Sequence, residues 1–138
     1  MENAKPFVVV VDDDASVARA LKRLLRSIGV DAQSFASGEA FLHALTTLPS
    51  WHPDCVILDI QMPGLNGLEV QLRIAGTGLP VIIITACDDT GVMEQALSAG
   101  AFGYFRKPFD DQLFIQTVRA ALAKSQGTRG VQETNGSP

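Results

Sequence analysis

The chain has 138 residues, of which 46% are hydrophobic and 19% charged, a balance that is typical of one globular domain and excludes a disordered or fibrous protein. The net charge of −4 argues against direct nucleic-acid binding, because phosphate contacts need a cationic surface. Cys55 and Cys87 lack metal-ligand spacing, so we expect neither a disulfide framework nor a zinc site. No apolar run approaches the roughly 20 residues of a membrane span. The first residues also lack the apolar segment of a signal peptide, so we expect a cytoplasmic protein.

Short apolar runs alternate along the chain with segments of helical period. We predict strands at residues 7–11, 30–35, 55–58, 81–84 and 101–106. We predict helices at residues 17–28, 37–48, 66–75, 90–99 and 110–124. The second strand is the most polar, so we expect it at an edge of a sheet. Residues 125–138 hold one large apolar side chain, Val131. We therefore assign residues 1–124 to one domain and predict a disordered polar tail, or the remnant of a linker, at residues 125–138.

The order of these elements predicts an α/β fold. Five apolar strands, each followed by a helix, indicate a parallel sheet with helices on both faces. Right-handed crossovers with one reversal of winding give a flavodoxin-like, doubly wound sheet of strand order 2-1-3-4-5. In such a sheet, ligands bind beyond the carboxyl ends of the strands, near the point of reversal.

The predicted strand ends carry residues that are suited to phosphoryl chemistry. In chain order they are Asp12, Asp13, Asp14, Asp59, Thr85 and Lys107. Asp14 is expected to cap the following helix. The other three carboxylates would repel one another unless a cation joined them, and Mg²⁺ suits a site of few carboxylates and waters. A carboxylate can attack a phosphoryl group, while Mg²⁺, an ammonium and a hydroxyl spread the charge of the transition state. Neither GxxxxGK[ST] nor GxGxxG occurs, so nucleotide binding is unsupported.

In this order and spacing, the sequence closely resembles the receiver domain of two-component response regulators over residues 6–123. The motifs that carry the resemblance are Asp12-Asp13, Leu58-Asp59-Ile60-Gln61-Met62-Pro63-Gly64 with Gly67, Ile84-Thr85-Ala86, and Lys107-Pro108-Phe109. The sequences of these motifs are similar to those of receivers with helix-turn-helix outputs in nitrogen-fixation and nodulation type regulators. We expect either a single-domain regulator that acts through protein contacts or a receiver separated from its effector.

The resemblance implies a role for each residue at the strand ends. Asp59 would accept a phosphoryl group from a sensor histidine kinase. Asp13, Asp59 and the backbone carbonyl of Gln61 would hold Mg²⁺, for which Mn²⁺ can substitute, and Asp12 would act mainly through a bridging water. Lys107 would pair with phosphoryl oxygens, and its bond to Pro108 would be cis.

The resemblance also implies how the signal leaves the domain. Thr85 would bond a phosphoryl oxygen while Tyr104 turns inward, a shift between two pre-existing states. Gln61 and Cys87 occupy positions that tune the lifetime of the phosphoryl group. The domain would catalyse only its own phosphorylation and dephosphorylation, and would control an output domain or effector, with transcription as the regulated process. We expect phosphorylation to favour a homodimer.

Two other interpretations remain open. Haloacid-dehalogenase-like phosphatases also have DxD after a first strand, which would make Asp12 the nucleophile and would use Thr85, Lys107 and the pair at residues 110–111. That reading leaves Asp59 without a role. A degenerate receiver that binds partners without phosphorylation is the other possibility, although no key residue is missing.

Overall fold

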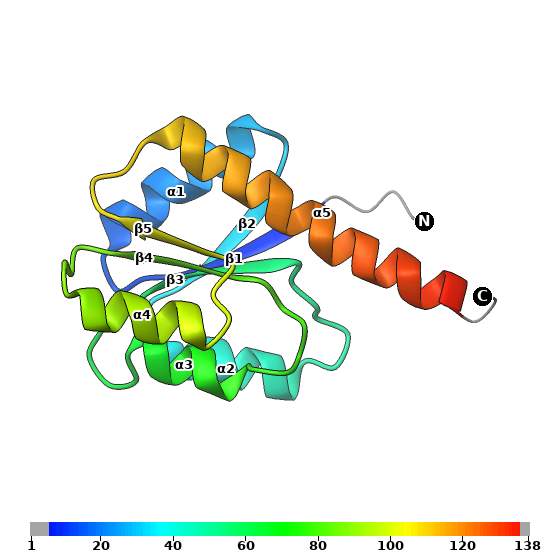
Figure 1. The fold of residues 1–138 in the computed structure, drawn as a ribbon, viewed down its shortest axis with the longest axis horizontal. Helices are drawn as coiled ribbons and strands as arrows, with labels where there is room; N and C mark the ends of the chain where they lie inside the picture. Colours follow the sequence, from blue (N-terminus) through cyan, green and yellow to red (C-terminus); the bar gives the residue numbers. More distant parts are fainter. Residues whose placement is uncertain (1–5, 136–138) are drawn as a thin grey trace.

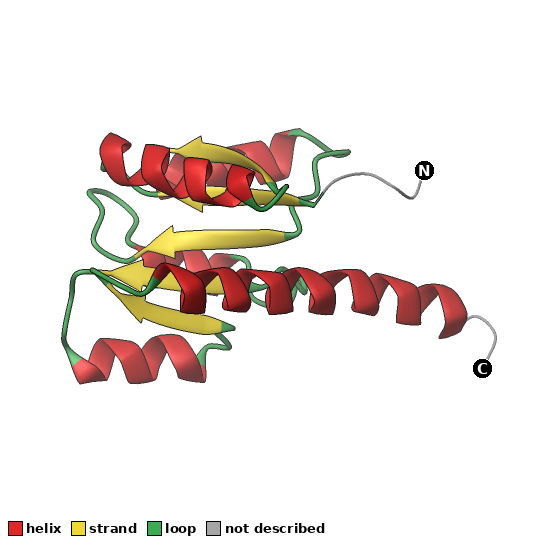
Figure 2. Ribbon diagram, turned by 90° about the horizontal axis from the view of Figure 1, so that it is seen from above, coloured by secondary structure: helices red, strands yellow, loops and turns green. Residues whose placement is uncertain are grey.

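The computed structural model describes residues 6–135, and describes side chains through residue 125. The strands are β1 (Phe7–Val11), β2 (Asp31–Phe35), β3 (Cys55–Asp59), β4 (Val81–Thr85) and β5 (Gly103–Arg106). The helices are α1 (Ala15–Ser27), α2 (Gly38–Thr47), α3 (Gly67–Arg73), α4 (Thr90–Ser98) and α5 (Asp111–Asn135). All strand pairs are parallel and the order is β2-β1-β3-β4-β5, which confirms the predicted fold class. The strand arrows point the same way in Figure 2.

The sheet separates two apolar layers (Figure 1). Alternate residues of a strand point to opposite faces. In β1, Val8 and Val10 therefore pack with α1 and α5, whereas Val9 and Val11 pack with α2, α3 and α4. Because helices cover both faces, the central strands β3 and β4 are buried at every position. The more polar β2 lies at one edge of the sheet, as predicted.

Side chains cap the helices that follow the strands. Asp14 Oδ1 accepts from the backbone N–H groups of Ser16 and Val17, at 2.9 and 3.3 Å, and so begins α1 as predicted. Asn66 and Glu69 form a reciprocal capping box at the start of α3. These caps fix where each helix begins relative to the strand before it.

The structure corrects several element ends. Helix α5 continues to Asn135 instead of ending near residue 124, and the absence of proline from the intervening residues is compatible with this continuation. The strand predicted from residue 101 begins at Gly103, since Ala101 N–H still bonds the carbonyl of Ala96 in α4. Leu48, the last residue of the helix predicted at residues 37–48, is 49% exposed because it lies beyond the last turn of α2, which ends at Thr47. The domain boundary at residue 124 stays a prediction.

Two further features of the fold bear on the predictions. Helix α3 ends at Arg73 instead of residue 75, and its buried side is that of Val70 and Ile74, which leaves Leu72 62% exposed.

Within residues 6–135, no helix has the length and apolar character needed to cross a membrane.

Candidate functional site

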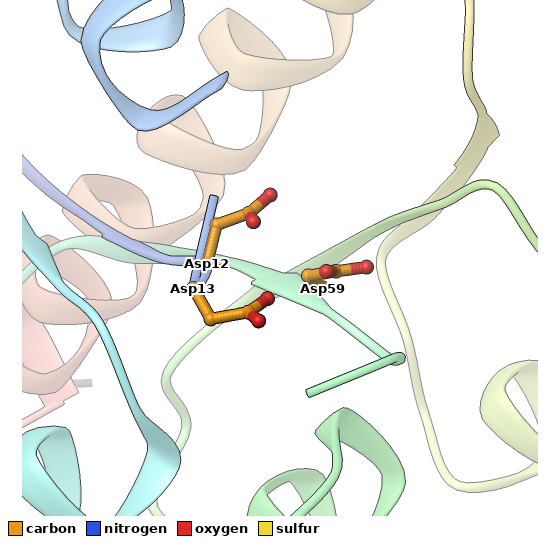
Figure 3. A group of neighbouring side chains, drawn as sticks. All are labelled: Asp12, Asp13 and Asp59. Carbon is orange, nitrogen blue, oxygen red and sulfur yellow. The ribbon is translucent and has the colours of Figure 1, made fainter. Parts of the chain in front are cut away.

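A cluster of carboxylates lies where β1 and β3 end. The two strands are neighbours, and Val11 pairs with Leu58, so Asp12 and Asp59 follow at the same edge. Asp12, Asp13 and Asp59 each offer an oxygen, and these oxygens all lie within 4.8 Å of one another. Their side chains project to the same side of the strand ends (Figure 3). Asp12 and Asp59 are buried and Asp13 is exposed, so the cluster opens to solvent on one side.

Lys107 brings a cation to this cluster from the end of β5. Its Nζ lies 3.1 Å from Asp12 Oδ2 and 3.8 Å from Asp59 Oδ1. Its backbone N–H donates to the carbonyl of Thr85 at 2.7 Å, and its peptide bond to Pro108 is cis, as the resemblance implies. One ammonium thus faces three carboxylates, which leaves the cluster with excess negative charge.

Backbone N–H groups orient two of the carboxylates. Asp14 N–H donates to Asp12 Oδ1 at 2.9 Å, and Gln61 N–H approaches Asp59 Oδ1 at 3.4 Å. These contacts hold the carboxylate of Asp12 in place and leave the second oxygen of Asp59 without a hydrogen bond from a described residue.

The pKa of Asp59 reflects this crowding. Burial raises it from 3.8 to about 6, and the charge of Asp12, followed by that of Asp13, acts in the same direction. Lys107 and the Gln61 N–H lower the pKa but do not compensate. An additional cation would relieve the repulsion.

The donor set fits a hard divalent ion. Mg²⁺ takes oxygen ligands at about 2.0–2.1 Å in octahedral geometry, so oxygens on opposite sides of the ion are roughly 4 Å apart. The spread of at most 4.8 Å among the three carboxylate oxygens is close to that span. Asp12, Asp13 and Asp59 could therefore share one ion after small side-chain movements.

The loop after Asp59 is held close to the cluster by Gly67. Its N–H donates to the carbonyl of Ile60 at 3.0 Å. A Cβ added at residue 67 would overlap the carbonyl oxygen of Asp59 and lie 2.8 Å from Cα of Ile60. Glycine is therefore required by this close approach.

Glu39 of α2 also holds this loop, a role that the sequence did not indicate. Its Oε2 accepts from the N–H of Leu65 at 3.1 Å. Gly64, beside it, has φ of 75°, a conformation that other residues rarely adopt. The contact spans 26 positions along the chain, so no local pattern could have revealed it.

Thr85 and Tyr104 lie on the neighbouring strands β4 and β5. Thr85 is fully buried, and its Oγ1 accepts from the N–H of Cys87 at 3.1 Å. The hydroxyl of Tyr104 is buried and has no hydrogen-bond partner among the described residues. Desolvation, followed by the charges of Cys87 and Asp89, raises the pKa of Tyr104. The hydroxyl of Tyr104 therefore does not face solvent in this structure.

The geometry does not support the phosphatase interpretation. Asp110, one of the acids that it needs, caps α5: its Oδ1 accepts from the N–H groups of Gln112 and Leu113 at 2.7 and 3.1 Å. Asp59, which that interpretation leaves unused, lies in the cluster instead.

Comparisons with known proteins define the family. Residues 8–119 match the model of the response regulator receiver domain. The chain therefore belongs to the response regulator receiver domain family, whose members act in phosphorylation-dependent signalling by two-component systems. This agrees with the resemblance carried by the sequence motifs.

Individual relatives agree. A crystal structure of a response regulator receiver protein from Burkholderia phymatum shares 65% identity and a TM-score of 0.80, covering 86% of this chain and 96% of that one. Nodulation protein W of Bradyrhizobium diazoefficiens is 35% identical over 96% of this chain and 58% of its own. The DNA-binding response regulator MtrA of Mycobacterium bovis is 36% identical over 91% of this chain and 54% of its own. The chain thus spans just over half the length of these two curated relatives.

Proposed function

We propose that this domain is a phosphorylation-activated switch in which Asp59 accepts the phosphoryl group. The observation that carries the proposal is the convergence at one sheet edge of Asp59, two further carboxylates within 4.8 Å and the ammonium of Lys107 at 3.8 Å. Asp59 lies at the centre of this group, because Asp12 and Asp13 come from β1 and Lys107 from the opposite side, after β5.

The transfer needs no general base. At pH values above its pKa of about 6, the carboxylate of Asp59 is ionised. One of its oxygens then attacks the phosphorus of a phosphohistidine. The new O–P bond forms as the N–P bond breaks, and the departing imidazole nitrogen keeps the electron pair. Lys107 lies close enough to Asp59 to pair with the oxygens of the incoming group. Hydrolysis of the acyl phosphate by water reverses the signal. In this proposal the domain catalyses only its own phosphorylation and dephosphorylation.

We assign the metal site to Asp12, Asp13, Asp59 and the backbone carbonyl of Gln61, with Mg²⁺ as the ion and Mn²⁺ as a substitute. When bound, the ion supplies positive charge that stabilises the phosphoryl oxygens in the transition state. The excess negative charge around Asp59 supports this assignment, because among the described side chains one ammonium, that of Lys107, forms ion pairs within this group of three carboxylates.

Thr85 and Tyr104 form the proposed switch. Thr85 Oγ1 already accepts a backbone hydrogen bond from Cys87, which leaves its own proton free to donate to a phosphoryl oxygen. The buried hydroxyl of Tyr104 gains a partner if Thr85 or the Cys87 loop moves toward it. Gln61 and Cys87, one exposed and one half-buried near the site, are the proposed determinants of phosphoryl lifetime.

The proposed partners are a sensor histidine kinase upstream and an output domain or effector downstream, with transcription as the regulated process and the cytoplasm as the location. The length of the relatives supports an output domain, since the match covers 58% and 54% of their chains. We also propose that phosphorylation favours a homodimer.

The assignment of Asp59 is tested by intact-mass spectrometry after incubation with acetyl phosphate and Mg²⁺. Wild type should gain one phosphoryl group, and Asp59→Asn should gain none. Asp111→Asn is the matched control, because its carboxylate is exposed at the start of α5 and lies outside the cluster. An adduct that persists in Asp59→Asn and disappears in Asp12→Asn would contradict the assignment.

The metal assignment is tested by thermal unfolding in EDTA and in Mg²⁺. A ligand at ten times its Kd stabilises the folded state by about 1.4 kcal/mol. We therefore expect Mg²⁺ to raise the Tm of wild type and of Asp111→Asn by several degrees, but to leave Asp13→Asn unchanged. Equal shifts in all three proteins would place the ion elsewhere.

A further inference from the structure

A cavity of about 620 Å³ lies at the amino ends of the strands, at the far end of the sheet from the carboxylates. It is open to solvent on one side and is lined by the second half of α2, the loop before β3, the end of α3, the loop before β4 and Ser125 of α5. Leu42, Leu45, Trp51 and Leu79 make it largely apolar. Its volume falls within the range of about 300–1,000 Å³ that small-molecule sites occupy. The hollow beside Asp12 and Asp13 is less than half as large, at about 260 Å³.

Trp51 forms a fixed wall of this cavity. Its indole N–H donates to Oε1 of Gln33 at 3.1 Å. Its ring packs edge-on against the rings of Phe7, Phe35 and Phe41, with centroids 5.7, 5.6 and 6.3 Å away. A ring held by four contacts is pre-organised, so ligand binding would lose little conformational entropy in ordering the ring.

The charge of the lining is the opposite of that of the whole chain. Arg73 and His52 are the basic side chains that line the cavity, and none of its described lining residues is acidic, although the chain carries a net charge of −4. Within the described side chains, no carboxylate forms an ion pair with Arg73. The guanidinium is therefore available to an anion.

The hydroxyl groups of the two threonines in the lining are already used within the protein. Thr46 Oγ1 donates to the carbonyls of Leu42 and His43, and Thr77 Oγ1 donates to the carbonyl of Ile74. Arg73 is consequently the main donor that an anionic ligand would meet at the apolar wall.

We propose that this cavity binds a small amphipathic organic anion, with its apolar part against Trp51, Leu42 and Leu45 and its carboxylate on Arg73. The apolar surface provides the driving force and the charge-assisted hydrogen bonds of the guanidinium select for an anion. The proposal does not rest on the role of Asp59, because the cavity lies at the other edge of the sheet and shares no residue with the acidic cluster.

Octanoate, below its micellar concentration, is a suitable probe, and octyltrimethylammonium is the matched probe of opposite charge. Trp51 is the only tryptophan in the chain, so its emission reports on this cavity alone. We expect octanoate to change the emission of Trp51 saturably with one-site stoichiometry in calorimetry, and the cation to bind at least about tenfold more weakly.

Three substitutions separate this site from other surfaces. Arg73→Gln should weaken octanoate binding by about tenfold, whereas Arg23→Gln, in an apolar hollow along α1, should bind like wild type. Leu45→Phe should weaken binding of both probes by filling the cavity. Absence of saturable binding, equal affinity for both probes, or unchanged affinity in Arg73→Gln would overturn the proposal.

Discussion

The carboxyl ends and the amino ends of the parallel strands, here called the carboxyl edge and the amino edge, carry different chemistry. At the carboxyl edge, Asp12, Asp13 and Asp59 converge on each other and on Lys107. At the amino edge, Trp51 and leucine side chains enclose an apolar cavity whose charged group, Arg73, has no acidic partner among the described side chains. Figure 2 shows that α5 extends past the amino edge, whereas the strand ends face the other way.

This difference shows how the fold divides its tasks. The carboxyl edge concentrates like charges, which makes the folded protein less stable without a cation but prepares it for phosphoryl chemistry. At the amino edge, the edge-on contact of Phe7 with Trp51 packs the start of β1 against the segment that precedes β3. Substitutions at the carboxyl edge should therefore change reactivity and pH dependence most strongly.

The largest effect is expected for Lys107→Met. Loss of the ammonium removes the one cation that lies within 4 Å of both Asp12 and Asp59 in the described structure. We expect the rate of phosphorylation by acetyl phosphate in Mg²⁺ to fall by about 100-fold. Intact-mass time courses measure this rate. Lys124→Met is the control, since its ammonium lies over the ring of Phe102, away from the carboxylates, and a comparable loss there would argue against a local role of Lys107.

A smaller effect is expected for Gly67→Ala, which tests how tightly the loop packs against Asp59. The added methyl group must displace the backbone of Asp59 and Ile60. We expect the free energy of unfolding in urea to fall by about 2–3 kcal/mol. In Gly91→Ala, the added methyl group meets a side-chain atom, Asp89 Oδ1, at 3.1 Å instead of overlapping the backbone, so its loss should be smaller. Equal stability of the two variants would mean that the close approach at Gly67 is not a constraint.

The smallest effect concerns stability as a function of pH, measured in EDTA. The folded pKa of Asp59, about 6, lies above its ordinary value of 3.8, so the folded state binds more protons between these values. Stability should therefore fall as pH rises through this window. At pH values above it, Asp59→Asn should be more stable than wild type by about 1–2 kcal/mol, because solvent screening reduces the full linkage value of about 3 kcal/mol.

This advantage of Asp59→Asn should vanish at pH values below the window, where Asp59 is protonated in both states. Urea unfolding of wild type, Asp59→Asn and Asp111→Asn across the pH range measures it. Asp111→Asn should follow the wild-type curve, because its carboxylate is exposed. A wild-type protein that gains stability as the pH rises through the window would show that the charge of Asp59 is fully compensated without metal.

Much of the carboxyl edge could be predicted from the sequence. Continuous apolar runs such as 55–58 define buried strands, and an acid directly after such a run must lie at the sheet edge. The strand order then brings Asp59 beside Asp12. Local patterns were sufficient here because each residue of the acidic cluster ends a predicted strand or directly follows one.

The rest depends on contacts between distant segments. The end of α5 could not be placed because polar residues without proline fit a helix or a tail equally well. Leu48 resembles a continuation of the inward stripe of α2, but the helix ends before it. The burial of the Tyr104 hydroxyl and the contact of Glu39 with Leu65 arise from packing. The cavity at the amino edge combines residues from several separate segments, and no motif marks it.

The most direct test of the central claim is to locate the phosphoryl group chemically. Borohydride reduces an aspartyl phosphate to homoserine, so protein treated with acetyl phosphate and Mg²⁺ can be reduced, digested and sequenced by tandem mass spectrometry. We predict homoserine at position 59, present with Mg²⁺ and absent with EDTA. Homoserine at position 12 or 13 with an intact Asp59 would contradict the account.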